Sequence, residues 1–207
     1  MSWSLFDEPL GWQVLPLPDA DVRLHEGLDL GRAADSLMQA LVEETPWRQD
    51  PIRVHGREYL QPRLHAWVGD AQAQYTYSGL HLTPQPWTPL LSDLRARLEA
   101  ACDARFNSVL LNLYRNERDS MGMHADDEAE LGPQPVIASL SLGQTRNLVF
   151  KHRWRDGLKP VHVPLPSGSV LLMAGATQTH WKHGIAKQSR ALAPRLNLTF
   201  RWIHPAH

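Results

Sequence analysis

A series of short β-favouring runs follows Phe106 and constrains the fold more than any other feature of the sequence. Gly, Pro, Asn or Asp separates each run from the next. Short strands at this spacing, without helical patterns between them, are typical of an antiparallel sandwich or barrel and argue against a βαβ fold. The runs are "SVLLNLY", "VIASLSL", "NLVFKH", "VHVPL", "SVLLMA" and "PRLNLTFRWI".

Two amphipathic helices are predicted before these strands. From about Gly31 to Glu44, apolar residues recur at helical spacing. The second helix has Thr88 as its expected N-cap and Pro89 as its first residue. We therefore predict an α+β fold, with the N-terminal helices packed on one sheet of a C-terminal antiparallel double sheet. The expected buried stripe of the second helix consists of Leu91, Leu94, Leu98 and Ala101.

The other N-terminal segments are less regular. Residues 1–28 are interpreted as an irregular extension with a short strand around Trp12 to Leu15. Residues 47–62 contain strand-like pieces interrupted by "DP" and "HG", which predicts a hairpin. Its arginines, at positions 48, 53, 57 and 63, are expected to lie against Asp50 and Glu58.

The charge balance excludes a global attraction to nucleic acid or membranes. The chain has 207 residues, a net charge of -1 and a pI near 6.8, so nucleic-acid binding would need a local basic patch. Its one cysteine, Cys102, cannot form an intramolecular disulfide, which favours a reducing compartment. We recognise no signal peptide and no apolar run that could span a bilayer. We expect one structural domain in a soluble, cytoplasmic protein without membrane contact.

The stretch "RLNLTFR", residues 195–201, has two different faces if it forms a strand. Side chains alternate along a strand, so Leu196, Leu198 and Phe200 share the face that must be buried. The second face is polar and basic. It is either a solvated surface whose arginines snorkel, or the lining of a polar cavity that receives an anion. Its residues are Arg195, Asn197, Thr199 and Arg201.

The two arginines of this stretch suit a ligand with two negative ends. Their Cα atoms lie about 20 Å apart along a strand, and two long side chains that lean toward each other could meet a small dicarboxylate. Asn197 and Thr199, between them, can support those contacts. The pattern R-x-N-x-T-x-R arises by chance about once in a thousand sequences of this composition, which favours the anion cavity.

The stretch "MHADDE" places His124 and Asp126 two residues apart. On a strand both side chains point the same way, so an imidazole and a carboxylate could bind one ion. A facial triad of two histidines and one carboxylate leaves open positions on a metal for a cosubstrate and dioxygen. The H-x-D pair alone is a weak motif, and a surface loop with a histidine beside acidic residues is the alternative.

A third ligand is expected from "THWKHGI", where His180 and His183 compete. We favour His183, because Gly184 frees the backbone at that point and a strand-like "GIA" follows. His180 is then interpreted as a packing residue or a neighbour of the ligands.

Taken together, these residues resemble the AlkB-type dioxygenases, which depend on Fe(II) and 2-oxoglutarate and repair alkylated nucleic acids. The resemblance extends from about Trp47 to Ile203 and is greatest to members that act on single-stranded DNA and RNA. It implies a double-stranded β-helix (jelly-roll) core at 107–207, preceded by helices and nucleotide-recognition hairpins at 29–106 and the extension at 1–28. The stretches that carry it are "QPRLHAWVGD", "YTYSGL", "FNSVLLNLYRNERDSMGMHADDEAELG", "VIASLSLGQTR", "WKHGI" and "APRLNLTFR".

The resemblance implies roles for individual residues. His124, Asp126 and His183 match the family's iron ligands. Without the resemblance, Asn112 would be interpreted as a polar residue of an edge strand and Tyr114 as ordinary core. The residues that match contacts to 2-oxoglutarate are Asn112, Tyr114, Arg195, Asn197, Thr199 and Arg201.

The resemblance also implies a base-recognition site. Tyr75 and Tyr77 match an aromatic strand that packs on the flipped base, with Tyr77 as the stacking partner and His124 closing the stack from the metal side. Stacking of a base on an aromatic ring is worth roughly 1–3 kcal/mol. Asp127 and Glu128 match acidic residues that read the exocyclic amine or order the site. The alternatives are a tyrosine strand packed on a core and a generic acidic turn.

One departure from the family concerns the hairpin at "QDPIRVHG", where some relatives carry an apolar finger that enters duplex DNA. Here only Ile52 and Val54 are apolar, and a wedge needs a large apolar side chain. This favours alkylated single-stranded DNA or RNA as the substrate, with duplex DNA as a further candidate. Separately, we expect the protein to be a monomer. The expected basic contacts are "KHRWR", residues 151–155, and the hairpin arginines at 48, 53 and 57.

The implied reaction uses Fe(II), 2-oxoglutarate and O2 to hydroxylate the N-methyl carbon of a base such as 1-methyladenine or 3-methylcytosine. The adduct releases formaldehyde, with succinate and CO2 as coproducts, and the base must be flipped or unpaired to reach the iron. Two alternatives are a 2-oxoglutarate oxygenase acting on a protein or small molecule, and a metal- or anion-binding module without oxidation chemistry. A zinc hydrolase is disfavoured, because the paired arginines have no place in its chemistry.

Overall fold

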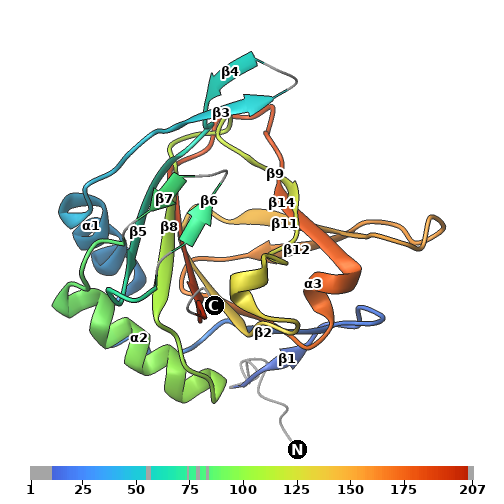
Figure 1. The fold of residues 1–207 in the computed structure, drawn as a ribbon, viewed down its shortest axis with the longest axis horizontal. Coiled ribbons are helices and arrows are strands. Elements are labelled where there is room, and N and C mark those ends of the chain that lie inside the picture. The colour runs from blue at the N-terminus through green and yellow to red at the C-terminus, as the bar shows by residue number, and fades with distance from the viewer. Residues whose placement is uncertain (1–10, 55–56, 74, 78–79, 83, 205–207) are drawn as a thin grey trace, which may run out of the picture.

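Two antiparallel β-sheets form most of the protein, as a computed structural model shows for residues 11–54, 57–73, 75–77, 80–82 and 84–204 (Figure 1). The larger sheet has seven strands in the order β1-β2-β13-β10-β15-β8-β5. Their bounds are β1 (Gln13–Val14), β2 (Asp21–His25), β5 (Leu64–Gly69), β8 (Ser108–Tyr114), β10 (Ile137–Gly143), β13 (Val170–Ala174) and β15 (Arg195–Arg201).

The smaller sheet has four strands in the order β12-β11-β14-β9. Two separate hairpins, β3–β4 and β6–β7, lie beside the two sheets. The remaining strands are β3 (Pro51–Val54), β4 (Arg57–Leu60), β6 (Tyr75–Tyr77), β7 (Leu80–Leu82), β9 (Met121–His124), β11 (Arg146–His152), β12 (Val161–Leu165) and β14 (Trp181–Ile185). The helices are α1 (Ala34–Glu44), α2 (Pro89–Cys102), α3 (Thr177–His180) and a 3-10 turn (Ala129–Leu131).

The eight strands from β8 to β15 are shared between the sheets: β8, β10, β13 and β15 belong to the larger one and β9, β11, β12 and β14 to the smaller. Residues from distant parts of the chain therefore meet in the space between the sheets. Each of the β-favouring runs predicted after Phe106 contains a strand, so the β-rich half of the prediction is confirmed. No helix among the described residues is long and apolar enough to cross a membrane.

The start of α2 follows its predicted cap. The Oγ1 atom of Thr88 accepts a hydrogen bond from the backbone N–H of Leu91 at 3.2 Å, and Pro89 is the first helical residue. The α1 helix begins at Ala34, three residues later than expected, because Gly31 has a φ of +74°, which a right-handed helix does not allow.

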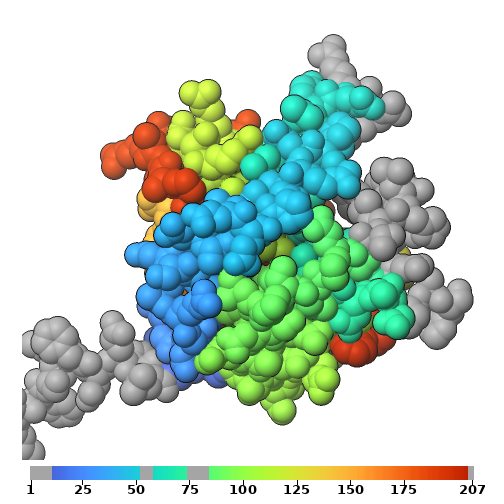
Figure 2. Space-filling view, turned by 90° about the vertical axis from the view of Figure 1, so that its left-hand side faces the viewer, coloured from blue at the N-terminus to red at the C-terminus, as the bar shows by residue number. Residues whose placement is uncertain are grey.

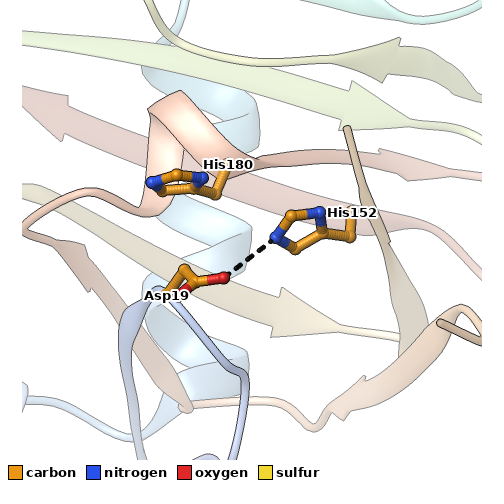
Figure 3. A group of neighbouring side chains, drawn as sticks. All are labelled: Asp19, His152 and His180. Atoms are coloured by element: carbon orange, nitrogen blue, oxygen red, sulfur yellow. Dashed lines mark ion pairs between the residues drawn. The ribbon is translucent and has the colours of Figure 1, made fainter. Parts of the chain in front are cut away.

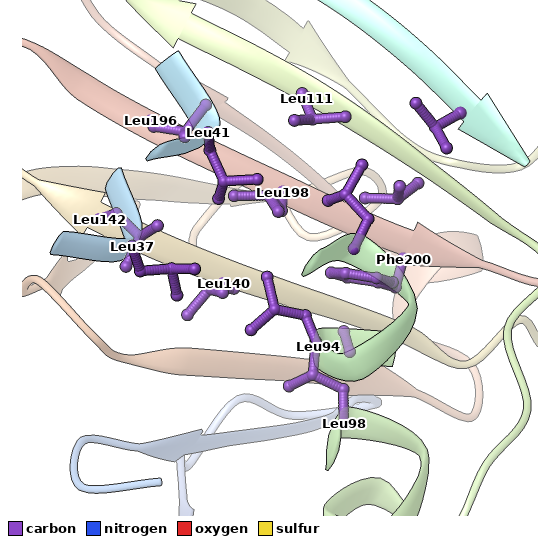
Figure 4. Close-up of a cluster of buried hydrophobic side chains, with 14 of the residues drawn as sticks. Leu37, Leu41, Leu94, Leu98, Leu111, Leu140, Leu142, Leu196, Leu198 and Phe200 are labelled. Atoms are coloured by element: carbon purple, nitrogen blue, oxygen red, sulfur yellow. The ribbon is translucent and has the colours of Figure 1, made fainter. Parts of the chain in front are cut away.

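Hydrophobic residues fill the space on both sides of the larger sheet. On its outer face, leucines of α1 and α2 pack against Leu196, Leu198 and Phe200 of β15 (Figure 4). The two helices cover this face from outside (Figure 2). On its inner face, a second cluster joins the two sheets and includes Ile137 and Phe150. The polar face of β15 also turns into this inner space.

Strand β2 was not predicted from the sequence. β2 lies within the segment interpreted as an irregular extension, and it pairs antiparallel with β13 as an integral part of the larger sheet. Its alternating buried residues, Val22 and Leu24, are separated by Arg23, so only two apolar positions marked the strand in the sequence.

Candidate metal centre and anion pocket

The polar face of β15 lines a pocket between the two sheets. Arg195 is 2% exposed and Asn197 and Thr199 are 8% and 7% exposed, so this face is not a solvated surface. Arg201, at the end of the strand, also lines the pocket. Of the two interpretations that the sequence left open, the structure shows the polar cavity.

His124, Asp126 and His183 meet at one end of this pocket. His124 and His183 are partners in the register of β9 and β14, and their ring centroids are 4.5 Å apart. Each imidazole Nε2 lies 3.8 Å from one oxygen of the Asp126 carboxylate. All three ligand atoms lie within 4.8 Å of one another, a spacing that one ion with bonds of about 2.0–2.2 Å can bridge.

The route by which Asp126 reaches this site differs from the prediction. His124 is the last residue of β9, and Asp126 lies in the loop that follows, not on the strand. The two side chains therefore do not meet through strand alternation. Asp126 is instead held from outside β9, because its carboxylate accepts a hydrogen bond from Nη2 of Arg201 at 2.7 Å.

The protonation states suit a metal. The Nδ1 atom of His124 lies 2.9 Å from the carbonyl oxygen of Gly122, which can only accept, so Nδ1 carries the proton and Nε2 offers its lone pair to the site. Burial lowers the pKa of His183 to about 4, so this imidazole is neutral at pH 7. Burial alone would raise the pKa of Asp126, but the charge of Arg201 and its hydrogen bond to the carboxylate lower the pKa below its usual value.

Several buried polar atoms of the pocket have no hydrogen-bond partner among the described residues. They include Oδ2 of Asp126, Nε of Arg201, and both Nε and Nη1 of Arg195. Buried polar groups are almost always paired, so unpaired ones that line a pocket are candidates for contact with a ligand or water. A cation beside Asp126 and a carboxylate beside Arg195 would satisfy these atoms, and the residues fit a metal with a dicarboxylate.

The two arginines are not equivalent in this respect. Arg195 donates through Nη2 to Ser141 Oγ at 2.8 Å and keeps two N–H groups open at the far end of the pocket. Arg201 is engaged with Asp126 beside the metal ligands. Arg201 thus contacts the carboxylate of Asp126, whereas Arg195 has two N–H groups without a partner among the described residues. That both arginines bind a dicarboxylate stays a prediction.

Asn112 and Tyr114 on β8 also line the pocket. Asn112 lies opposite Asn197 in the strand register, and its Oδ1 accepts a hydrogen bond from Nε of Arg63 at 2.8 Å. This contact leaves the amide N–H groups of Asn112 for a ligand. Arg63, which the sequence analysis grouped with Asp50 and Glu58, thus also contacts a residue of the pocket.

The predicted base-recognition residues are only partly described. Tyr75 and Tyr77 are on strand β6, but their side chains lie outside the described residues. Asp127 forms an ion pair with Arg153 at 2.6 Å. Oε2 of Glu128 is buried and accepts no hydrogen bond from the described residues, so this carboxylate oxygen can accept one from a ligand.

Polar residues that the sequence prediction missed support the side chains of the pocket. Ser141 holds Arg195, and Ser139 accepts a hydrogen bond from Nδ2 of Asn197 at 2.8 Å. Both serines alternate with leucines in "ASLSLG", the same period-2 signal that drew attention to β15. Arg146 is buried and donates to the carbonyl oxygens of Asp119 and Ala186, for which the sequence carried no comparable signal.

A second group, Asp19, His152 and His180, also brings two imidazoles and a carboxylate together (Figure 3). Its hydrogen bonds oppose metal binding. The Nδ1 atom of His152 accepts from the backbone N–H groups of Trp154 and Arg155, so the neutral ring carries its proton on Nε2, 3.4 Å from Asp19. Arg155 pairs with the same carboxylate at 2.6 Å. The structure thus places His180 in a group that links the β1–β2 turn to β11, and His183 beside His124.

The sequence matches the 2OG-Fe(II) oxygenase superfamily over residues 22–201. It is 41% identical over 192 residues to "Alpha-ketoglutarate-dependent dioxygenase alkB homolog 3" of Homo sapiens, covering 89% of this chain and 66% of that protein. It is also 41% identical over 194 residues to "DNA oxidative demethylase ALKBH2" of Homo sapiens, covering 86% of this chain and 74% of that protein. The chain therefore spans slightly less than two thirds of the first of these relatives.

The fold has a counterpart among solved structures. The structure of OsALKBH1 superposes on this protein with a TM-score of 0.63 over 92% of this chain and 99% of the other. At 17% sequence identity this similarity supports a shared fold and nothing further.

Proposed function

The chain belongs to the 2OG-Fe(II) oxygenase superfamily and, within it, to the AlkB-type dioxygenases, and from this membership we propose that it demethylates alkylated bases in nucleic acid. The substrates are bases of the 1-methyladenine and 3-methylcytosine type in DNA, and RNA is a further substrate. The cofactors are Fe(II), 2-oxoglutarate and O2, and the products are the unmodified base, formaldehyde, succinate and CO2.

One observation carries this proposal. A buried pocket holds two imidazoles and a carboxylate at one end and a guanidinium with two unpaired N–H groups at the other. An ion and a dicarboxylate satisfy these groups together, whereas either one alone leaves buried polar atoms without partners. A protein that binds only a metal or only an anion would need just one of these two groups of residues.

Each pocket residue then has a task. His124, Asp126 and His183 would hold Fe(II), because two histidines and one carboxylate are the ligand set of non-haem iron oxygenases. Arg195 binds the distal carboxylate of 2-oxoglutarate, while Asn112 and Tyr114 position the same molecule. Arg201 orients Asp126 and supports the other carboxylate. Asn197 and Thr199, which share a hydrogen bond at 3.1 Å, complete the polar wall.

The bound iron and 2-oxoglutarate supply the oxidation: O2 delivers one oxygen atom to the N-methyl carbon and one to the new carboxylate of succinate as CO2 leaves. The resulting N-hydroxymethyl group breaks its C–N bond to give formaldehyde, and the ring nitrogen regains its electron pair. The protein must hold the base outside its stack for this to happen, because a stacked methyl group cannot approach the site.

The fold agrees with the core expected from the family resemblance. The distribution of β8 to β15 between two sheets supports a double-stranded β-helix at 107–207, with α1 and α2 on the larger sheet. The hairpins β3–β4 and β6–β7 belong to the nucleotide-recognition part at 29–106. We propose that a monomer carries both parts.

We assign base recognition to the residues that the family resemblance implies. Tyr75 and Tyr77 stack on the base, and the open oxygen of Glu128 accepts a hydrogen bond from its exocyclic amine. The carboxylate of Asp127 is held by Arg153 and orders the loop that follows β9. The polar hairpin at 51–60 favours single-stranded nucleic acid, with duplex DNA as a poorer substrate.

The predicted basic stretch at 151–155 offers fewer free cations than its sequence suggests. Arg153 and Arg155 form ion pairs with Asp127 and Asp19, so reversing their charge would disturb the protein itself. Lys151 is exposed and lies opposite the exposed Lys182 of β14. Like charges directly opposite each other in a sheet repel, and a phosphate between them relieves the repulsion.

We therefore expect the double variant Lys151→Gln/Lys182→Gln to weaken binding to single-stranded DNA. The slope of log affinity against log salt should fall by about 1.4, roughly 0.7 for each lysine that no longer neutralises a phosphate of a single strand. The exposed Arg105, beside the end of α2, provides a control, since Arg105→Gln should leave the slope unchanged. A double variant with the wild-type slope would remove these lysines from the interface.

The test of the function is mass spectrometry of short oligonucleotides that carry one defined methylated base. With Fe(II), 2-oxoglutarate and air, a strand with 1-methyladenine or 3-methylcytosine should lose about 14 mass units, one CH2. Omission of 2-oxoglutarate is the control. Succinate formation with no change in any oligonucleotide would instead favour the oxygenase of a protein or small molecule.

A further inference from the structure

The loop that carries Asp126 leaves β9 after His124, so no strand pairing holds the metal-binding carboxylate in place. A metal ligand must be fixed to within a fraction of an ångström, and residues around the ligands usually provide this support. The Arg201 contact fixes the carboxylate itself. The backbone of the loop needs a support of its own.

The side chain of Gln178 provides that support. Its Oε1 accepts the backbone N–H of Asp126 at 3.0 Å, and both residues are 2% exposed. The amide orientation follows from this contact, because a backbone N–H needs an acceptor. The Nε2 atom then faces the Sδ atom of Met173 at 3.6 Å, a weak acceptor that also borders the pocket.

Gln178 lies in α3, the short helix between β13 and β14 (Figure 1). His183 follows five residues later on β14, so α3 connects directly to one metal ligand through the chain and holds another through Gln178. The same residue also holds the next loop position, because its carbonyl oxygen accepts a hydrogen bond from Arg153, which pairs with Asp127.

We propose that Gln178 is a positioning residue for the metal site: its buried side chain fixes the backbone of Asp126 and thereby sets where the carboxylate meets the two imidazoles. This inference rests on the proposed function. Nothing in the glutamine's own chemistry requires contact with metal, cosubstrate or base. Its effect passes through one hydrogen bond to a backbone N–H that has no other partner in the described part of the chain.

The test compares Gln178→Met with Thr177→Val in the full-length chain, using anaerobic Co(II) titration and the visible absorption of the bound ion. Methionine keeps the length of the side chain and removes the acceptor. We expect Gln178→Met to weaken Co(II) binding about 10–100-fold and to change the absorption bands, which report ligand geometry. Gln178→Glu keeps an oxygen at the position and should restore most of the affinity.

Thr177 is the matched control, because it anchors the same helix through the carbonyl oxygens of Ala174 and Asp21 without touching Asp126. Thr177→Val should lower the melting temperature and leave Co(II) affinity and spectrum unchanged. Equal losses in both variants, or wild-type binding in Gln178→Met, would overturn the inference. If Gln178→Met does not fold, Gln178→Asn takes its place, because its side chain is one methylene shorter and moves the acceptor away from Asp126. We expect the same weaker Co(II) binding and changed absorption bands.

The two levels of the proposal fail in different ways. If the wild-type chain binds no Co(II) at all, the proposed metal centre is wrong and this inference falls with it. If the wild type binds one Co(II) and Gln178→Met binds it equally well with the same spectrum, the metal centre stands and only the positioning role is wrong.

Discussion

Replacing His183 with alanine is expected to abolish stoichiometric metal binding and to reduce demethylation by on the order of a thousandfold or more, because the metal supplies the oxidation. His183 is buried, its Nε2 lies 3.8 Å from Asp126, and its ring is 4.5 Å from that of His124. Two ligands cannot replace three in holding a labile ion. Bound iron per chain and formaldehyde release are the two measurements.

The control for this prediction is His180→Ala. His180 is the other histidine of the same segment, and the structure places it against His152, with ring centroids 5.8 Å apart. We expect His180→Ala to bind one metal per chain and to keep its turnover within a few-fold of the wild type. Loss of metal from His180→Ala with retention in His183→Ala would show that the ligand set is wrong.

Replacing Arg195 with methionine is expected to remove 2-oxoglutarate binding while leaving metal binding intact. The guanidinium is 2% exposed, and its Nε and Nη1 groups have no partner among the described residues. Burial lowers the pKa of Arg195, because the guanidinium is removed from water. A carboxylate provides the missing partner, and two parallel N–H···O bonds give the pair its strength.

Thermal unfolding with and without 2-oxoglutarate measures this effect, with Mn(II) in place of iron. At a ligand concentration of 100 Kd, binding should stabilise the wild type by about 2.7 kcal/mol, or roughly 5–10 °C for a domain of this size. The Arg195→Met variant should show no ligand-dependent shift. Without ligand it should be at least as stable as the wild type, since an apolar side chain replaces an unpaired buried charge.

Arg195→Lys separates charge from geometry. A lysine keeps the positive charge but has no fork to bind both carboxylate oxygens, so the KM for 2-oxoglutarate should rise about tenfold or more. Arg190, exposed in the loop before β15, is a control, and Arg190→Met should keep the ligand-dependent shift. A full thermal shift in Arg195→Met would remove the arginine from the anion site.

Local signals in the sequence were sufficient for the elements whose stability depends on near neighbours. Thr88 and Pro89 mark the start of α2 because capping involves atoms within one turn. The alternation in residues 195–201 predicted both faces of β15, because a strand turns successive side chains to opposite sides whatever it pairs with. The same reasoning would have found Ser139 and Ser141 on β10.

Local signals failed where a residue is positioned by partners far away in the chain. Strand alternation seemed to explain how His124 and Asp126 meet, but Asp126 lies beyond the strand and is held by Gln178 and Arg201, 52 and 75 residues away. Arg63 was grouped with the acidic residues of the hairpin, and only the structure shows that it also donates to Asn112, 49 residues away. β2 was missed because its place depends on pairing with β13.

By itself, the sequence determined which residue types were available and which faces of the strands they occupy. It also carried the family membership, and with it the candidate ligands. Only the tertiary structure decided that the face of Arg195 is enclosed rather than solvated, that one arginine is open while the other supports Asp126, and that His180 and His183 belong to different groups. The physical reason is that alternation and capping act over a few residues, whereas enclosure and hydrogen-bond pairing depend on which strands the two sheets bring together.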